Sequence, residues 1–248
     1  METRWRTKLI IGLILMSSCF YGINYLIFKD PPFMLRLVTL QLGFVPISVI
    51  LITLFLNRLI ANREKRIRLA KLNMVIGSFF SEVGTALLKS FSDFDPNRDR
   101  FSQELILTSQ WSNQDFSKAR KYVMTHDYSI QIQKDKLEEL RNFLLGKRTF
   151  LLRLLENPNL FEHESFTDLL SAIFHLTEEL AHRADVKELC STDCQHLADD
   201  IKRAYALLFS EWLAYIQHLR DSYPYFYSLA IRTNPLNPEA SPEVTQSL

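Results

Sequence analysis

The sequence predicts an all-α protein in which a two-helix transmembrane hairpin precedes a cytoplasmic helical bundle. Two uncharged apolar runs, 9–28 and 37–56, lie near the start of the chain. Each is about twenty residues long, which as a helix matches the roughly 30 Å hydrocarbon layer of a membrane. Beyond them, apolar residues recur every three or four positions, the spacing of amphipathic helices, and no strand alternation is evident.

The overall composition averages these two parts. A hydrophobic content of 47% and a mean hydropathy of -0.04 are ordinary for a soluble chain of 248 residues, so the totals hide the hairpin. We expect a hairpin over 1–60, a helical domain over 61–232 and a flexible tail over 233–248. Because 29 basic residues face 28 acidic ones, the charge balance argues against a nucleic-acid partner.

The basic residues beside the apolar runs predict the orientation, since Lys and Arg flanking a span are retained in the cytoplasm. They are Arg4, Arg6 and Lys8 before the first run, and Arg58, Arg63, Lys65, Arg66, Arg68 and Lys71 after the second. The connecting loop has only Lys29 and Arg36 against Asp30. We therefore expect a multi-pass protein of the cytoplasmic (inner) membrane with both termini in the cytoplasm. Arg63, Lys65, Arg66, Arg68 and Lys71 would contact anionic lipid headgroups at the membrane surface.

Two other interpretations of the hairpin are open. Met16-Ser17-Ser18-Cys19 resembles a bacterial lipidation box, but the apolar run continues past Cys19, which favours an uncleaved helix. Asn24, Thr39 and Gln41 are the polar residues that a pore would use, and Pro46 would kink the second helix. Neither run contains an ionisable residue to mark an ion path, so packing within the hairpin is the favoured interpretation.

The segment after the second run has the clearest helical period. Its apolar positions are Leu69, Leu72, Ile76, Phe79, Val83 and Ala86. Gly77, Ser81 and Gly84 form a strip of small side chains beside them. Because each glycine weakens a helix by about 1 kcal/mol, the strip predicts close approach of another backbone, in the same chain or in a second copy.

The remaining chain predicts several further helices. We expect short helical patches at 103–107 and 115–124, and amphipathic helices over 131–155, from Ser165 with Asp168 as capping partner, and over 193–222. The last of these is long enough to be the central packing helix, with Ser191, Thr192 or Asp193 as its cap. A short element follows at 225–231.

The stretches 71–77, 79–82, 156–160 and 163–170 resemble a group of uncharacterised prokaryotic two-span membrane proteins with a cytoplasmic helical domain. The resemblance extends from the second apolar run almost to the tail. It implies the architecture and a prokaryotic membrane, and it supplies no catalytic residue.

Candidate chemistry is confined to a few side chains. His175, Glu179 and His182 share one helix face, and Glu179 with His182 has the Glu-x-x-His spacing of di-iron bundles. The second copy of that motif is missing, and a solvated polar face is the favoured explanation. Cys190, Cys194 and His196 lack zinc-site spacing. We therefore predict no catalytic residue, no cofactor and no bound metal, and a chain that is not an enzyme.

The function that follows is a membrane-anchored helical interaction or scaffold protein of unknown pathway. Its partners would be the lipid bilayer, an unknown protein or a second copy of itself. The aromatic group at 223–227 is a candidate contact surface because Pro224 places it at a helix end. The alternatives are an oligomeric two-span pore or transport component, and a metal-dependent helical-bundle enzyme built on His175, Glu179 and His182.

Overall fold

A computed structural model describes residues 2–98, 105, 107, 110–158, 160, 163–237 and 240–243. The side chains of residues 2–7, 9, 28, 66 and 68–70 are outside this description. Across the described ranges the regular structure is helical and contains no strand, which confirms the all-α prediction. The chain divides into two compact units, residues 1–66 and 67–248.

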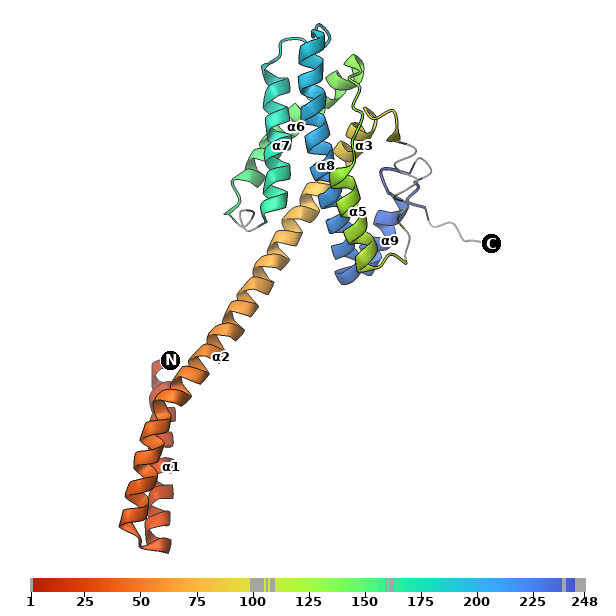
Figure 1. The fold of residues 1–248 in the computed structure, drawn as a ribbon. Coiled ribbons are helices and arrows are strands. Elements are labelled where there is room, and N and C mark those ends of the chain that lie inside the picture. Colours follow the sequence, from red (N-terminus) through yellow and green to blue (C-terminus); the bar gives the residue numbers. More distant parts are fainter. Residues whose placement is uncertain are drawn as a thin grey trace. The chain divides into compact units, whose positions relative to one another are not determined.

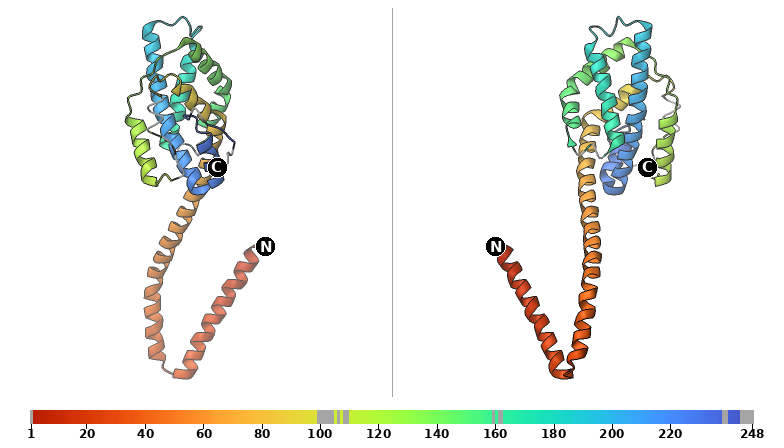
Figure 2. Two further views of the ribbon diagram at one scale, coloured as in Figure 1. Left: turned by 90° about the vertical axis from the view of Figure 1, so that its right-hand side faces the viewer. Right: turned by 60° about the vertical axis from the view of Figure 1, so that its left-hand side comes forward.

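The first unit is a helical hairpin. It contains α1 (Glu2–Phe28) and the first part of α2 (Pro31–Phe79), shown in red and orange in Figures 1 and 2. Lys29 adopts a left-handed conformation with φ 46°, and the Asp30 carboxylate then accepts a hydrogen bond from the Phe33 N–H at the start of α2. Both helices are long and apolar enough to cross a membrane, over Ile10–Ile27 and Pro31–Lys65, and neither stretch is buried.

The second unit is a helical bundle around one long helix. It contains the end of α2, a π-helical turn η1 (Phe80–Gly84), and α3 (Thr85–Ser92), α5 (Asn113–Thr125), α6 (Lys134–Leu155), α7 (Glu164–His182), α8 (Ser191–Ser222) and α9 (Pro224–Arg232). α3, α5, α7 and α9 all contact α8, and α6 packs against α7 (Figure 2). The longest predicted amphipathic helix is therefore the centre of the bundle.

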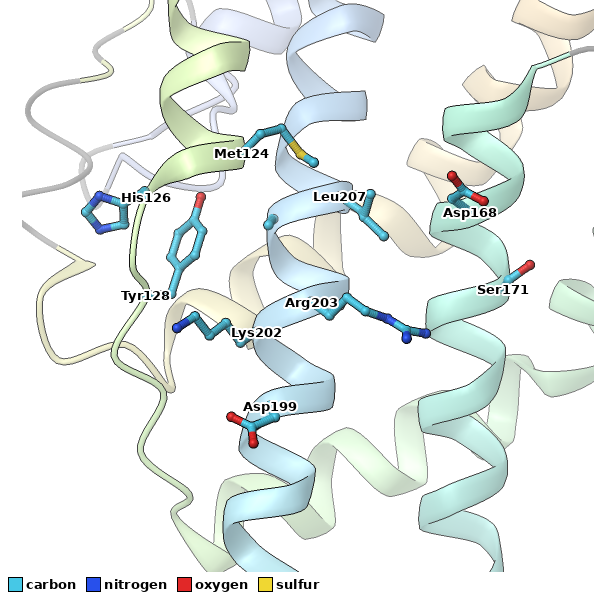
Figure 3. A pocket seen from close by; sticks show the side chains of 10 residues that line it. Met124, His126, Tyr128, Asp168, Ser171, Asp199, Lys202, Arg203 and Leu207 are labelled. Carbon is cyan, nitrogen blue, oxygen red and sulfur yellow. The ribbon is translucent and has the colours of Figure 1, made fainter.

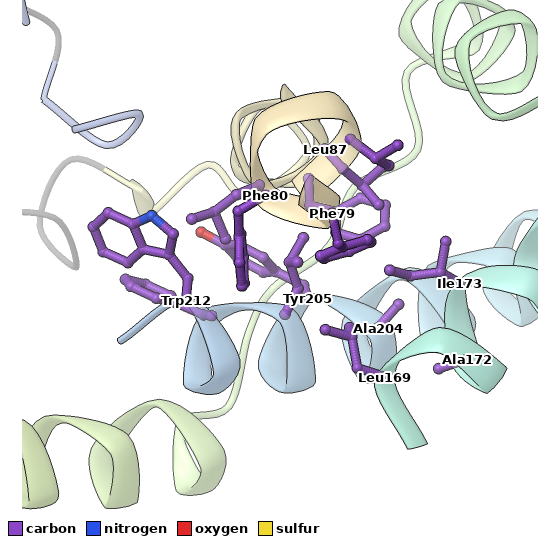
Figure 4. Close-up of a cluster of buried hydrophobic side chains, with 14 of the residues drawn as sticks. Phe79, Phe80, Leu87, Leu169, Ala172, Ile173, Ala204, Tyr205 and Trp212 are labelled. Atoms are coloured by element: carbon purple, nitrogen blue, oxygen red, sulfur yellow. The ribbon is translucent and has the colours of Figure 1, made fainter. Parts of the chain in front are cut away.

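Aromatic side chains fill the centre of this bundle. Figure 4 shows Phe79 and Phe80 packed toward Tyr205 of α8 and Ile173 of α7. The Phe79 ring meets Phe166 edge to face with centroids 5.2 Å apart, and the Phe80 ring stacks on Tyr215 at 4.9 Å. These contacts fix the end of α2 against α7 and α8.

The π-helical turn changes which residues face the core. Leu72, Ile76, Phe79 and Val83 are buried as predicted, whereas Ala86 is exposed and Leu87 is buried in its place. A π-helical turn adds one residue to the helix and shifts the later positions around its axis. The prediction of Ala86 as a core position is therefore wrong, because it assumed an uninterrupted α-helical period.

Several helix boundaries differ from the prediction. α6 starts at Lys134 rather than at residue 131. α7 is capped by His163, whose Nδ1 accepts a hydrogen bond from the Phe166 N–H at 3.3 Å, so the predicted Ser165 cap is wrong. α8 has Cys190 at its N-cap without a side-chain cap. Most of the predicted patch at 103–107 is outside the described residues.

Candidate functional site

Four chemically active side chains meet where α7 packs against α8. His175 and Glu179 lie one helical turn apart on α7, and His196 and Asp200 lie one turn apart on α8. The Asp200 Oδ2 atom is 3.4 Å from His175 Nε2 and 3.5 Å from His196 Nε2. Glu179 completes the group, with Oε1 3.9 Å from His175 Nε2 and Oε2 3.7 Å from His196 Nε2. We call these four residues the His/Asp cluster.

The spacing within each helix brings the cluster together. Residues four positions apart point to the same side of a helix, so each helix presents one imidazole and one carboxylate to the other. Both imidazoles remain accessible, with 46% of the His175 side chain and 52% of the His196 side chain exposed. Asp200 lies deeper, at 14%. The cluster is therefore open to solvent on its imidazole side and closed below Asp200.

Arg183 holds the edge of the cluster. It follows α7 and donates two hydrogen bonds to Asp193, at 2.6 and 2.8 Å, and one to Glu179 Oε2 at 2.7 Å. These hydrogen bonds hold the pKa of both the Glu179 and Asp193 carboxyls below their usual range. The same bonds raise the pKa of the Arg183 guanidinium. Glu179 is thus kept ionised and fixed in position by a neighbouring cation.

The donor atoms of His175, His196 and Asp200 all lie within 4.8 Å of one another. Imidazole nitrogen and carboxylate oxygen are ligands that zinc and other first-row divalent metals accept. The Asp200 Oδ2 atom is inaccessible to solvent and receives no hydrogen bond within the described part of the chain. Such an orphaned buried oxygen is costly unless a proton donor or a cation satisfies it.

The structure brings together only two of the three residues that the sequence predicted as a candidate metal site, His175, Glu179 and His182. His175 and Glu179 lie in the cluster, whereas His182 Nδ1 is 2.8 Å from the Glu178 carbonyl oxygen on its own helix and is not part of the group. Cys190 and Cys194 are free thiols outside it. Sequence reasoning missed Asp200, and the available signal was its position four residues after His196.

The small-residue strip packs against aromatic rings of its own chain. A methyl group on Gly77 would lie 3.7 Å from the Tyr215 ring, an ordinary contact. On Gly84 it would lie 2.6 Å from the Phe80 ring and 2.8 Å from Phe79, closer than real side chains approach. Ser81 is exposed. Close packing at the strip thus concentrates at Gly84.

The predicted headgroup-binding residues are placed only in part. The side chains of Arg63, Lys65 and Lys71 are exposed. Those of Arg66 and Arg68 lie outside the described residues. The exposed members leave their charges available to anionic groups.

A groove of about 670 Å³ lies on the same face of α7 and α8, beside the end of α5 (Figure 3). Arg203 extends from α8 toward α7, whereas Lys202 points toward the segment after α5, where it contacts Asp127 (Figure 3). Asp168 and Ser171 line the α7 side. The groove is mixed in charge and continues the polar face that carries the cluster.

A second candidate surface is aromatic. α9 exposes Tyr225 almost completely, at 93%, together with Phe226 at 61% and Leu229 at 42%. Tyr227, on the opposite side of this short helix, is buried. α9 therefore uses one face to pack on α8 and leaves a compact apolar face uncovered within the described residues.

The comparisons with known proteins cover both units. Residues 1–60 match a family model described as the N-terminal helical domain of MJ1433, and residues 68–232 match that of the C-terminal helical domain of the uncharacterized protein MJ1433. The protein of that name from Methanocaldococcus jannaschii is similar to this chain, with 43% identity over 236 residues and 95% of each chain covered. No solved structure matches the chain.

Proposed function

The chain belongs to the family of the uncharacterised protein MJ1433, and from this premise we propose that it is a membrane-anchored helical interaction module. The hairpin would anchor it in the cytoplasmic membrane with both termini in the cytoplasm. The bundle would bind a protein partner there and would act as a scaffold rather than as an enzyme.

The exposed surface of the hairpin carries the proposal. Leu26, Leu35 and Leu40 have 71%, 71% and 76% of their surface exposed, and large apolar side chains continue along both helices. Burying one such side chain yields about 1.5 to 3 kcal/mol, so dozens of exposed ones would not remain in water. The bundle already has its own core, from Leu72 onward. A lipid environment is the natural cover for the hairpin.

The orientation rests on charge. The basic residues that follow the second apolar run outnumber those of the connecting loop, and positive flanks remain on the cytoplasmic side. Exposed Arg63 and Lys65 lie at the end of the apolar part of α2. Each would gain about 1 kcal/mol near anionic headgroups.

The uncovered face of α9 supports the interaction role. Aromatic side chains are enriched where proteins bind one another, because they bury a large area with little loss of side-chain freedom. Tyr225 and Phe226 are exposed while the rest of the bundle core is closed. This face is the docking surface that we assign to a protein partner.

The pore alternative has less support. The Tyr21 hydroxyl donates a hydrogen bond to the Gln41 side chain across the hairpin. The Thr39 hydroxyl donates to the Leu35 carbonyl oxygen of its own helix at 2.8 Å. The bond to Gln41 joins the two helices and favours packing within the hairpin, and the Thr39 hydroxyl is satisfied by its own helix.

Topology reporters test the anchor. A reporter that is active only outside the cytoplasm should be silent when fused after Leu248, and active when inserted between Lys29 and Pro32. An active fusion after Leu248 would overturn the orientation. Recovery of the chain in the soluble fraction of lysed cells would overturn the membrane anchor itself.

The mass of the complex extracted from native membranes in detergent tests the docking surface. We expect an assembly larger than the 29.1 kDa chain that dissociates when Tyr225 and Phe226 are both replaced by Ser. Met124→Ser, which removes another exposed apolar side chain, is the matched control and should leave the assembly intact. A monomeric wild type would contradict the proposal. An oligomer of this chain alone that resists the α9 changes would favour the pore.

A further inference from the structure

We propose that the His/Asp cluster between α7 and α8 binds one divalent transition-metal cation of the zinc class. His175, His196 and Asp200 would be the three core ligands, and Glu179 would supply the fourth position. This site goes beyond the interaction role and does not depend on it.

The separations within the cluster fit a tetrahedral ion. Zinc bonds nitrogen and oxygen ligands at about 2.0 to 2.1 Å, which places neighbouring ligand atoms in a tetrahedral site about 3.3 Å apart. The Asp200 Oδ2 atom is 3.4 and 3.5 Å from the two imidazole nitrogens, and the Glu179 oxygens are 3.7 and 3.9 Å from them. The Asp200 distances are already close to this value, whereas the two imidazole nitrogens, which lie within 4.8 Å of each other, and the Glu179 carboxylate would move closer around the ion.

The buried oxygen of Asp200 gives an independent reason for a cation. It has no accessible surface and no hydrogen-bond donor among the described residues, although two imidazoles face it. A metal ion between the three groups would satisfy this oxygen and use the facing nitrogen of each imidazole.

Simple ion pairing explains the arrangement less well. To neutralise Asp200 and Glu179, both imidazoles would carry a proton, and two like charges whose nitrogens lie within 4.8 Å would repel each other. One divalent cation balances the same two carboxylates with neutral imidazoles. Because Arg183 is shared between Glu179 and Asp193, both arrangements balance the remaining negative charge, but only the metal does so without placing two imidazolium ions side by side.

Arg183 orients Glu179, the proposed fourth ligand. It binds Glu179 Oε2 and anchors itself on Asp193. The Glu179 Oε1 atom then remains directed to His175 and is available to the ion. Groups that orient ligands in this way commonly change metal affinity by about 10- to 100-fold.

The consequence for the fold is a cross-link between two helices. The ligands come in pairs from α7 and α8, so the ion would join the central helix to its neighbour. A ligand that binds only the folded state stabilises that state.

Zinc titration of the purified full chain in detergent, after removal of metals with a chelator, tests the proposal. We expect one equivalent of Zn²⁺ to bind and to raise the melting temperature. His196→Gln and Asp200→Asn should each weaken binding at least about tenfold. His182→Gln, on the same helix but outside the cluster, is the matched control and should bind Zn²⁺ like the wild type.

Protection of the histidines from chemical modification tests the same site in the wild-type protein, without relying on the folding of any variant. Diethyl pyrocarbonate acylates accessible imidazoles, and peptide mass spectrometry locates the modified residues. In the wild-type protein, one equivalent of Zn²⁺ should protect His175 and His196 and leave His182 reactive. The proposal is overturned by the absence of saturable one-to-one binding, by equal protection of all three histidines, or by an equal loss of affinity in His182→Gln.

Discussion

Two buried tyrosines in contact, Tyr128 and Tyr205, differ in the hydrogen bonding of their hydroxyl groups. The Tyr128 hydroxyl donates a hydrogen bond to the Val123 carbonyl oxygen at 2.9 Å. The Tyr205 hydroxyl is buried and has no hydrogen-bond partner in the described ranges. The two rings lie 4.7 Å apart, and burial raises the pKa of both hydroxyls, so both stay protonated. The core therefore holds one satisfied and one unsatisfied phenol.

Replacing each tyrosine by Phe should give opposite results. Tyr128→Phe removes a hydrogen bond and leaves a buried carbonyl without this donor, which should cost about 1 kcal/mol of unfolding free energy. Tyr205→Phe removes an unpaired hydroxyl and should be neutral or stabilising by up to about 1 kcal/mol. Chemical unfolding of both variants beside the wild type measures the difference. A larger loss for Tyr205→Phe would show that its hydroxyl has a partner.

Among the helices, the π-helical turn η1 begins at the second of two consecutive aromatic residues, Phe79 and Phe80. Both are buried here. Backbone and side chain of Thr85 both donate hydrogen bonds to the Phe80 carbonyl oxygen, the side chain at 2.8 Å, which holds the widened turn. Gly84 ends this turn where the two rings leave no space for a side chain.

Alanine substitutions should distinguish the two glycines of this segment. Gly84→Ala pushes a methyl group into Phe79 and Phe80 and should lower the unfolding free energy by about 1 to 3 kcal/mol. At Gly77 the same methyl group has room, and the gain in helix propensity should make Gly77→Ala neutral or stabilising by up to about 1 kcal/mol. Thermal unfolding of the two variants provides the comparison. Equal stability would mean that the helix at Gly84 shifts to make room.

The sequence predicted the helices much better than their irregular features. Periodicity located α6, α7 and α8, because burial of one face repeats with the helical period. After the hairpin it identified the buried positions Leu72, Ile76, Phe79 and Val83, whereas the side chain of Leu69 lies outside the described residues. The π-helical turn has no such periodic signal, so the helical period alone predicts Ala86 in the core, where the structure has Leu87. The capping pattern of Ser165 with Asp168 is the more usual one, so the sequence does not indicate the His163 cap.

Across the whole molecule, the His/Asp cluster could not be predicted from the sequence pattern of one helix, because its residues come from two helices. His175 and Glu179 were recognised because they lie on the same helix face. His196 and Asp200 belong to α8, and only the packing of α7 on α8 brings them to His175. Periodicity predicts which face of each helix is buried. It does not predict how α7 and α8 are rotated relative to each other, so the sequence does not show that His196 and Asp200 lie beside His175. Two imidazole–carboxylate pairs at four-residue spacing were the available signal.

The division into two units predicts that the bundle folds without the hairpin. Among the described side chains, the buried apolar core begins at Leu72, so a chain starting at Ile67 keeps this core and loses the exposed apolar surface of the hairpin. We expect this shortened protein to be soluble without detergent and to unfold cooperatively. Its melting temperature should lie within about 4 °C of the full chain, a difference of about 1 kcal/mol for this size.

A chain starting at Phe80 is the matched control for this experiment. It lacks Leu72, Ile76 and Phe79, which are 3%, 5% and 0% exposed in the bundle. At about 1.5 to 3 kcal/mol for each buried side chain, the loss approaches the 5 to 15 kcal/mol by which domains are usually stable. This control should be unfolded or aggregated at 25 °C, as measured by circular dichroism. If both shortened chains aggregate, the bundle needs the hairpin to fold, and the two units are not independent; if both fold, the end of α2 contributes little to the core.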